Sequence, residues 1–237
     1  MQRPQFFDDE IYHIYNRGVD KRRVFLSDKD RLRFVHDLYE FNDEAAALNT
    51  GYYYDQGTKH IASIFKKPRK PLVEILSFCE MPNHFHLLVR QVKEWGITAF
   101  MRKLGTGYTN YFNQKYQRSG VLFQGKFKAV HVEKESHLVY LPHYIHLNAL
   151  DIVMPEWRGG NGNIKVALRF LESYRWSSYL DYIGKKNFPS VIVNSPLQIY
   201  GSPTSIDYQD MIKEWLKEFN LSLIEKVAIE PMEVGLQ

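Results

Sequence analysis

Two histidines separated by a single residue form the most chemically suggestive pair in the sequence. His84 and His86 flank Phe85 at the start of the stretch HFHLLVRQ, which is typical of a β-strand. Side chains alternate between the two faces of a strand, so both imidazoles share one face, about 7 Å apart at their Cα atoms. That spacing lets two neutral imidazoles bind one metal ion. A solvated or merely hydrogen-bonded histidine pair is the plainer alternative.

A tyrosine and an asparagine stand one helical turn apart later in the chain. Tyr144 and Asn148 are at i and i+4 of a helical pattern, and therefore lie one above the other on one helix face. In isolation they would be a surface pair. Combined with the two histidines, Asn148 becomes a candidate third metal ligand through its carbonyl oxygen. Tyr144 can then direct its hydroxyl at whatever the metal holds.

The charge of this ligand set indicates the chemistry. Two neutral imidazoles and a neutral amide leave a divalent ion its full charge, which suits it to gripping and polarising a phosphodiester. Nitrogen and oxygen ligands with vacant positions fit Mg²⁺ or Mn²⁺, although imidazoles also tolerate Zn²⁺. A tyrosine with its ordinary pKa of about 10 is a poor nucleophile, but a nearby cation favours the phenolate. Attack of a tyrosine on phosphorus is the reaction that these residues predict.

The elements that must position these residues follow the order strand, helix, hairpin, helix, strand, helix. This order predicts an α+β sandwich, with an antiparallel sheet and helices packed against it. A Pro- and Ser-rich stretch, 189–203, precedes the last helix. The predicted elements are a strand at 12–16, a helix from Ser27 to about Asn42, an exposed basic loop at 50–71, a hairpin of 72–80 and 84–91, a helix at 97–116, a strand within 120–133, a helix at 136–150, a short helix ending near 175 and an amphipathic helix at 205–219.

Composition narrows the class of protein. The chain of 237 residues has 31 Lys and Arg against 27 Asp and Glu, a surplus that permits an anionic partner without proving one. The single cysteine, Cys79, excludes a disulfide framework and a cysteine-cluster zinc site, and favours a reducing compartment. The sequence contains neither an apolar run long enough to span a bilayer nor a secretory signal, so we expect a cytoplasmic protein.

Six stretches in a fixed order resemble the REP-associated tyrosine transposases, which are single-tyrosine members of the HUH endonuclease superfamily. The likeness covers roughly residues 10–183, and HFH corresponds to the His-hydrophobe-His signature of that superfamily. The stretches are YHIYNRGVDKRRVF, MPNHFHLLV, GTGYTNYFNQKY, RSGVLFQGKFKAVHVE, YIHLNAL and RWSSYLDYIG. The sequence departs from the common pattern at Pro142-His143 and at Ala149, and these departures leave the proposed ligands intact.

The resemblance implies a ferredoxin-like α+β core over residues 1–183, followed by a C-terminal extension, 184–237, with one amphipathic helix. It implies that His84, His86 and Asn148 hold a divalent cation, Mg²⁺ or Mn²⁺, and that Tyr144 is the nucleophile. Such enzymes cut single-stranded DNA beside palindromic hairpins, retain the 5′ phosphate on the tyrosine and release a 3′-OH that can later rejoin strands. The family includes monomers and homodimers, so both states stay open.

Basic residues gather in the predicted loops and turns, where they suit contacts to DNA phosphates. Each cluster alone is equally well explained as a solvated charged face. Tyr52, Tyr53, Tyr54 and Phe65 are candidates for stacking on bases. The candidate DNA-binding residues are Arg17, Lys21, Arg22, Arg23, Lys66, Lys67, Arg69, Lys70, Arg102, Lys103, Arg118, Lys126 and Lys128.

Three alternatives remain at this point. Tyr108 or Tyr111 could be the nucleophile, although both sit in a helix whose apolar pattern indicates core packing. Tyr140, one turn before Tyr144, could support the nucleophile or serve as a stacking residue. The chain could be a domesticated protein that binds hairpin DNA without productive transposition. It could also be a structural zinc protein whose ligands come from His84, His86, His143 or His146.

Overall fold

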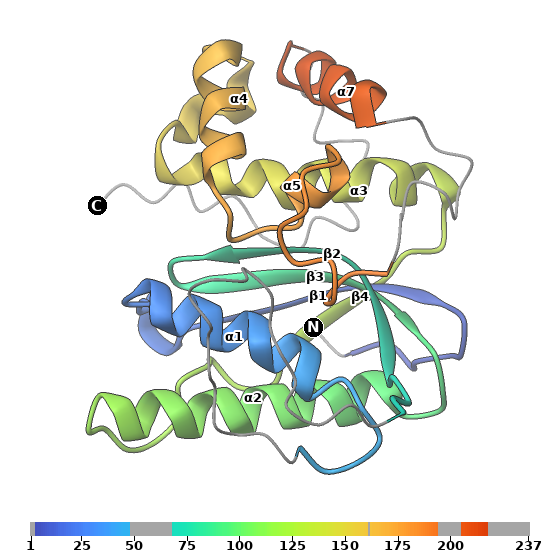
Figure 1. The fold of residues 1–237 in the computed structure, drawn as a ribbon, viewed down its shortest axis with the longest axis vertical. Coiled ribbons are helices and arrows are strands. Elements are labelled where there is room, and N and C mark those ends of the chain that lie inside the picture. The colour runs from blue at the N-terminus through green and yellow to red at the C-terminus, as the bar shows by residue number, and fades with distance from the viewer. Residues whose placement is uncertain (1–2, 48–67, 161, 194–204, 218–237) are drawn as a thin grey trace.

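An antiparallel sheet of four strands forms the centre of the molecule. The structure is a computed structural model that describes residues 3–47, 68–160, 162–193 and 205–217. The sheet has the strand order β2-β3-β1-β4, and helices cover both of its faces (Figure 1). Its strands are β1 (Ile11–Arg17), β2 (Val73–Met81), β3 (His84–Gln91) and β4 (Lys128–His131). The predicted α+β class with an antiparallel sheet is therefore confirmed.

Two long helices, α1 (Asp28–Glu40) and α2 (Gly96–Lys115), cover one face of the sheet (Figure 1). The buried Asp30 joins them. Its Oδ2 accepts the Ser27 N–H at 2.9 Å, which caps the first turn of α1. The same carboxylate accepts bonds from Lys115 at 2.5 Å and Tyr116 at 2.7 Å, at the end of α2. Burial alone would raise the pKa of Asp30, but these donors hold it below its usual value.

The C-terminal half of the chain covers the opposite face. It comprises α3 (Glu135–Leu147), the 3₁₀ segments η2 (Asn148–Ile152) and η3 (Pro155–Gly159), α4 (Ile164–Ser173), α5 (Tyr179–Tyr182) and α7 (Ser205–Lys217). Helix α5 and the residue before it also bond to β2: Ser178 N–H donates to the Phe78 carbonyl at 3.1 Å, and the Tyr182 hydroxyl donates to the Leu76 carbonyl at 2.9 Å. These bonds cover the edge strand β2.

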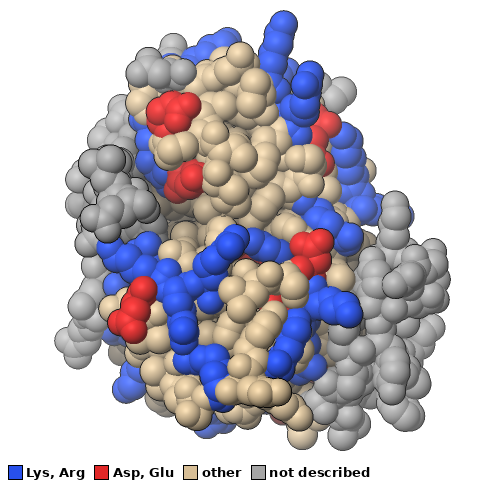
Figure 2. Space-filling view, turned by 90° about the vertical axis from the view of Figure 1, so that its left-hand side faces the viewer, with Lys and Arg blue, Asp and Glu red and all other residues tan. Residues whose placement is uncertain are grey.

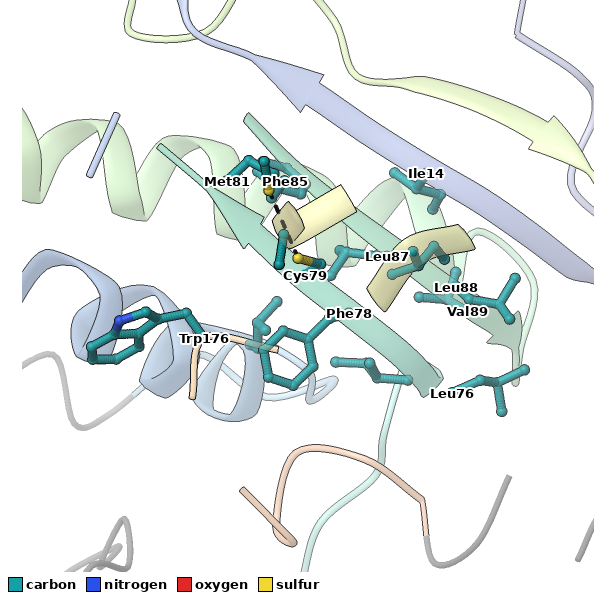
Figure 3. Packing of buried hydrophobic residues seen from close by; sticks show 14 of the residues in the cluster. Ile14, Leu76, Phe78, Cys79, Met81, Phe85, Leu87, Leu88, Val89 and Trp176 are labelled. Carbon is teal, nitrogen blue, oxygen red and sulfur yellow. Dashed lines mark hydrogen bonds between the residues drawn. The ribbon is translucent and has the colours of Figure 1, made fainter. Parts of the chain in front are cut away.

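The central strands are buried on both faces, which explains their nearly continuous apolar sequence. Figure 3 shows the apolar side chains of β2 and β3 packed around the two strands, with Leu87, Leu88 and Val89 at adjacent positions. Phe85 packs on Phe34 of α1 with ring centroids 4.9 Å apart. The neighbouring His84 and His86 therefore point to the other face, toward α3.

The strand predicted within 120–133 is found, but it is short and comprises only Lys128–His131. Gly120 and Gly125 adopt positive φ angles of 83° and 69°, a conformation that glycine adopts readily and that leaves the extended geometry of a strand. Residues 120–127 form a loop instead, which is bonded to the end of β1 by Gln124 N–H donating to the Arg17 carbonyl at 2.7 Å.

The other predicted elements are found close to their expected bounds. The short 3₁₀ turn η1 (Val19–Lys21) follows β1, as the Arg17-Gly18 turn signal predicts. Most of the predicted loop at 50–71 lies outside the described residues, and 68–71 has no regular structure. In the described part of the chain, no helix is long and apolar enough to cross a membrane.

Candidate active site

His84 and His86 meet on the face of β3 that lies beneath α3. Their ring centroids are 4.9 Å apart, with the rings edge to face, and both side chains are buried. The prediction that both imidazoles share one face of a strand is confirmed.

A third histidine, which sequence reasoning missed, joins this pair from the neighbouring strand. His13 of β1 is fully buried, and its Nε2 lies 3.0 Å from Nδ1 of His86. Tyr15, two residues further along β1, is directly opposite His86 in the sheet, and the two rings stack at 6.1 Å. The available signal was the stretch YHIYNR, whose alternate residues His13, Tyr15 and Arg17 share one strand face.

Both histidines of the pair are suited to binding a cation. Nδ1 of His84 lies 2.6 Å from Oδ1 of Asn83, an acceptor, so Nδ1 carries the proton and Nε2 carries the lone pair. Nε2 of His86 is buried and has no hydrogen-bond partner among the described residues. A buried imidazole nitrogen of this kind is what a metal ligand requires.

Burial keeps both rings neutral. Desolvation, followed by the charge of Arg17, lowers the pKa of His84 to about 3. Desolvation, followed by the neighbouring His84 and His13, lowers the pKa of His86 well below its usual value. At neutral pH neither ring carries a second proton, so no proton competes with a cation for the remaining ring nitrogen.

Tyr144 of α3 lies against these histidines in the same chain. Its ring centroid is 6.2 Å from that of His86 and 6.4 Å from that of His13, edge to face in both cases. The side chain is only 2% exposed. The tyrosine that the resemblance implies as nucleophile is therefore next to the two histidines that it implies as metal ligands.

The other candidate tyrosines point elsewhere. Tyr140 packs on Trp215 of α7 at 5.3 Å. Tyr108 donates to the Val24 carbonyl at 2.7 Å, and Tyr111 donates to Asp30 at 3.0 Å, both on the face covered by α1 and α2. Their positions favour Tyr144.

Asn148 is fully buried one turn beyond Tyr144, and both ends of its amide are occupied. Its Nδ2 donates to the Tyr144 carbonyl at 2.8 Å, and its Oδ1 accepts from Nη2 of Arg158 at 2.9 Å. Arg158 also forms an ion pair with Asp151 and packs over the Trp157 ring at 4.5 Å. The oxygen proposed as third metal ligand thus already contacts a cationic group, the guanidinium of Arg158.

One of the predicted DNA-binding residues lies directly beside the histidine pair. Arg17 is opposite His84 in the register of β1 and β3, and its Nε is buried with no hydrogen-bond partner among the described residues. The guanidinium of Arg17 therefore places a fixed positive charge next to the histidines. This position suits contact with a phosphate.

Most of the remaining basic residues in this group are exposed. Lys128 lies over the Tyr15 ring at 5.2 Å, at the edge of the same sheet face. Figure 2 shows Lys and Arg side chains in bands over one side of the molecule, with few carboxylates between them. The exposed members are Lys21, Arg22, Arg23, Lys70, Arg102, Lys126 and Lys128.

Three predicted DNA-binding residues bond instead to the chain's own carbonyls. Arg69 donates to the Asn42 carbonyl at 2.7 Å, and Lys103 donates to the Ala45 carbonyl at 2.8 Å, so both fasten the segment after α1. Arg118 donates to Asn113 at 2.7 Å and to the Val121 carbonyl at 3.1 Å. Their bonds indicate a structural role. Lys66, Lys67 and the predicted stacking residues Tyr52, Tyr53, Tyr54 and Phe65 lie outside the described residues.

The zinc alternative gains no support from the geometry. Both ring nitrogens of His146 are engaged, Nδ1 with the Tyr208 hydroxyl at 2.6 Å and Nε2 with Ser178 Oγ at 2.7 Å. His143 stacks between Tyr208 and Trp215, at 4.5 and 5.7 Å. Within the described ranges, no group of three or more His, Cys, Asp or Glu side chains is arranged to hold a metal ion. Any metal site here must therefore use other ligands, such as an amide or water, beside His84 and His86.

Comparisons with known proteins agree with this arrangement. The family model described as "Transposase IS200 like" matches residues 50–148, which include the histidine pair, Tyr144 and Asn148. Among solved structures, a REP-associated tyrosine transposase bound to a REP hairpin is similar over 82% of this chain and 92% of its own, with a TM-score of 0.50 and 9% sequence identity. No curated protein matches the sequence. Residues 50–148 are thus similar to the IS200-like transposases, and the fold of the chain is similar to that of a REP-associated tyrosine transposase.

Proposed function

We propose that this protein is a divalent-metal-dependent DNA strand transferase, which cuts and rejoins single-stranded DNA beside palindromic hairpins through Tyr144. The observation that carries the proposal is the position of the Tyr144 ring, 6.2 Å from that of His86 within a single chain. The solved structure with this fold is bound to a REP hairpin, which supports hairpin DNA as the substrate class.

The bond changes follow from the residues present. The Tyr144 phenol loses its proton to water, and its oxygen attacks phosphorus. A tyrosine–phosphate bond forms, the bond to the 3′ oxygen breaks, and that oxygen takes a proton from water. The DNA keeps a 3′-OH, and its 5′ phosphate stays on the enzyme. Attack by a 3′-OH on the phosphotyrosine reverses the step and joins strands without an external energy source.

His84 and His86 would hold the cation, with Asn148 as a third ligand once its oxygen is released by Arg158. Bound there, Mg²⁺ or Mn²⁺ would supply positive charge that polarises the phosphodiester and favours the phenolate. Arg17 supplies a fixed positive charge beside His84, suited to a non-bridging phosphate oxygen. Tyr144 reaches this site without a second subunit, which supports a nucleophile acting in cis.

The test is incubation of labelled hairpin-bearing single-stranded DNA with the protein and Mn²⁺, followed by denaturing electrophoresis. The expected product is a protein–DNA adduct that survives SDS and disappears in Tyr144→Phe. Tyr140→Phe, one turn earlier on α3 and packed on Trp215, is the matched control and should still form the adduct. Retarded DNA that is never cut would instead identify a hairpin-binding protein without transposase activity.

A further inference from the structure

A cavity of about 600 Å³ opens on the side of the sheet opposite the histidine pair. It lies between one face of α2 and the loop 120–127, a size typical of small-molecule sites. Two stretches singled out in the sequence, GTGYTNYFNQKY and RSGVLFQGKF, meet here, and the chemistry at Tyr144 uses neither.

The walls are apolar and the rim is cationic. Met101, Phe123 and Phe127 line the interior, whereas Arg3, Arg102 and Lys126 bring positive charge to the lining. The Arg3 guanidinium sits over the Phe127 ring at 4.6 Å. No Asp or Glu belongs to the described lining of the cavity.

Polar groups are also available to recognise a ligand by hydrogen bonding. Thr109 and Asn110 contribute a hydroxyl and an amide to the lining. Asn16 also lines the cavity, but its amide already accepts from Arg17 N–H at 2.9 Å and donates to the Gly125 carbonyl at 3.5 Å. Gly105 leaves space in the middle of α2, because a Cβ built there would meet nothing within 4 Å. A flat, apolar ligand with polar edges and an attached anion fits this combination.

One strand connects the cavity with the active site. Asn16 of β1 lines the cavity, and the next residue, Arg17, lies opposite His84 on the other face. The loop 120–127 is bonded to the same strand end through the Arg17 carbonyl. A DNA strand held at the histidine pair therefore has the cavity close to it, around the end of β1.

We propose that this cavity binds an unpaired nucleobase of the DNA strand that flanks the hairpin, with Arg102 and Lys126 contacting its phosphates. This inference rests on the proposed function, which it extends by a second contact to the same substrate. Apolar walls exclude water from the faces of a base, and the polar groups bond its edge. Charge complementarity favours a nucleic acid over an apolar peptide as the occupant.

The test is an abasic scan. Binding of fluorescent hairpins with a single-stranded flank is measured by anisotropy without divalent cations, and each flank nucleotide in turn is replaced by an abasic site. Loss of the base that fills the cavity should weaken binding about five- to a hundredfold at one or two positions. Gly105→Phe should reduce affinity for the intact flank by the same factor and flatten the scan, because its ring leans over the preceding turn into the cavity.

Gly105→Ala is the matched control: it meets no neighbour, favours the helix and leaves the cavity open, so its scan should equal that of the wild type. Arg102→Gln, at an exposed site, should lower the salt dependence of flank binding by about one phosphate contact.

An unchanged scan in Gly105→Phe overturns the proposal, as does an equal loss of affinity for a hairpin without a flank. Adduct formation at Tyr144 with an unchanged scan would refute the cavity alone, whereas a flattened scan without an adduct would refute the chemistry alone.

Discussion

The guanidinium of Arg158 holds the side-chain oxygen of Asn148, with Nη2 donating to Oδ1 at 2.9 Å. This oxygen is the one that a cation at His84 and His86 would use as a third ligand. A positive side chain therefore already contacts the oxygen that the proposed cation would use, and its charge would repel that cation.

The first prediction concerns this repulsion. Arg158→Met keeps an aliphatic side chain against Trp157 but removes the charge, so Mn²⁺ should bind roughly fivefold more tightly, as expected for about 1 kcal/mol of removed repulsion. Titration calorimetry on the DNA-free protein measures this directly. Weaker binding would mean that Arg158 instead orients Asn148 as a ligand.

The second prediction concerns His13, whose ring nitrogen lies 3.0 Å from Nδ1 of His86. Partners of this kind orient metal-binding histidines, and losing one typically costs about 10- to 100-fold in metal affinity. His13→Phe retains a buried ring, so we expect that loss in Mn²⁺ affinity together with intact thermal stability. Tyr15→Phe keeps the ring that stacks on His86 and should bind Mn²⁺ like the wild type.

The third prediction separates phosphate positioning from general DNA binding. Arg17→Gln removes the charge beside His84 and should lower the rate of adduct formation at saturating DNA about 10- to 100-fold, with little change in hairpin affinity. Arg23→Gln, at an exposed site, should do the reverse: slightly weaker binding and an unchanged rate. Equal effects of the two substitutions on rate would remove Arg17 from the reaction centre.

The fourth prediction is acid destabilisation through His143. Burial lowers the pKa of this histidine to about 4, below the unfolded value of about 6.5. The unfolded chain therefore binds the proton more readily, so the free energy of unfolding falls as the pH drops below 6.5 and the loss levels off below 4. At pH 5.5 the expected loss is on the order of 1 kcal/mol.

His143→Phe keeps the stacking on Tyr208 and should reduce the difference between pH 7.5 and 5.5 by that amount, as measured by urea unfolding. The other buried histidines contribute equally to both proteins and cancel in the comparison. A pH dependence identical to the wild type would contradict a buried neutral His143.

Much of the fold could be predicted from local sequence patterns. The HFH strand, the turn before it and the helix with Tyr144 are found where their periodicity and turn chemistry place them. The strand predicted within 120–133 is also found, at Lys128–His131, but the positive φ angle of Gly125 keeps the residues just before it in a loop.

Relationships between distant segments could not be predicted in this way. His13 joins His86 only through the register of β1 and β3, and Arg158 reaches Asn148 only because η3 folds back on η2. Similarly, Arg69 and Lys103 are basic residues in polar surroundings, and only the structure shows that they bond to carbonyls after α1. Charge clusters identify cations, but not the groups they contact.

The attachments of α3 bear on how two copies of this protein could act together. His146, two residues past Tyr144, bonds to Tyr208 of α7 and to Ser178, which is itself fastened to β2. In a dimer that exchanges the helix with Tyr144 between its subunits, this whole C-terminal layer would have to leave its own sheet together with α3. Only the short linker at residues 132–134 connects α3 to β4. The architecture thus favours self-sufficient subunits, in which inactivating one copy of a pair leaves its neighbour fully able to cut.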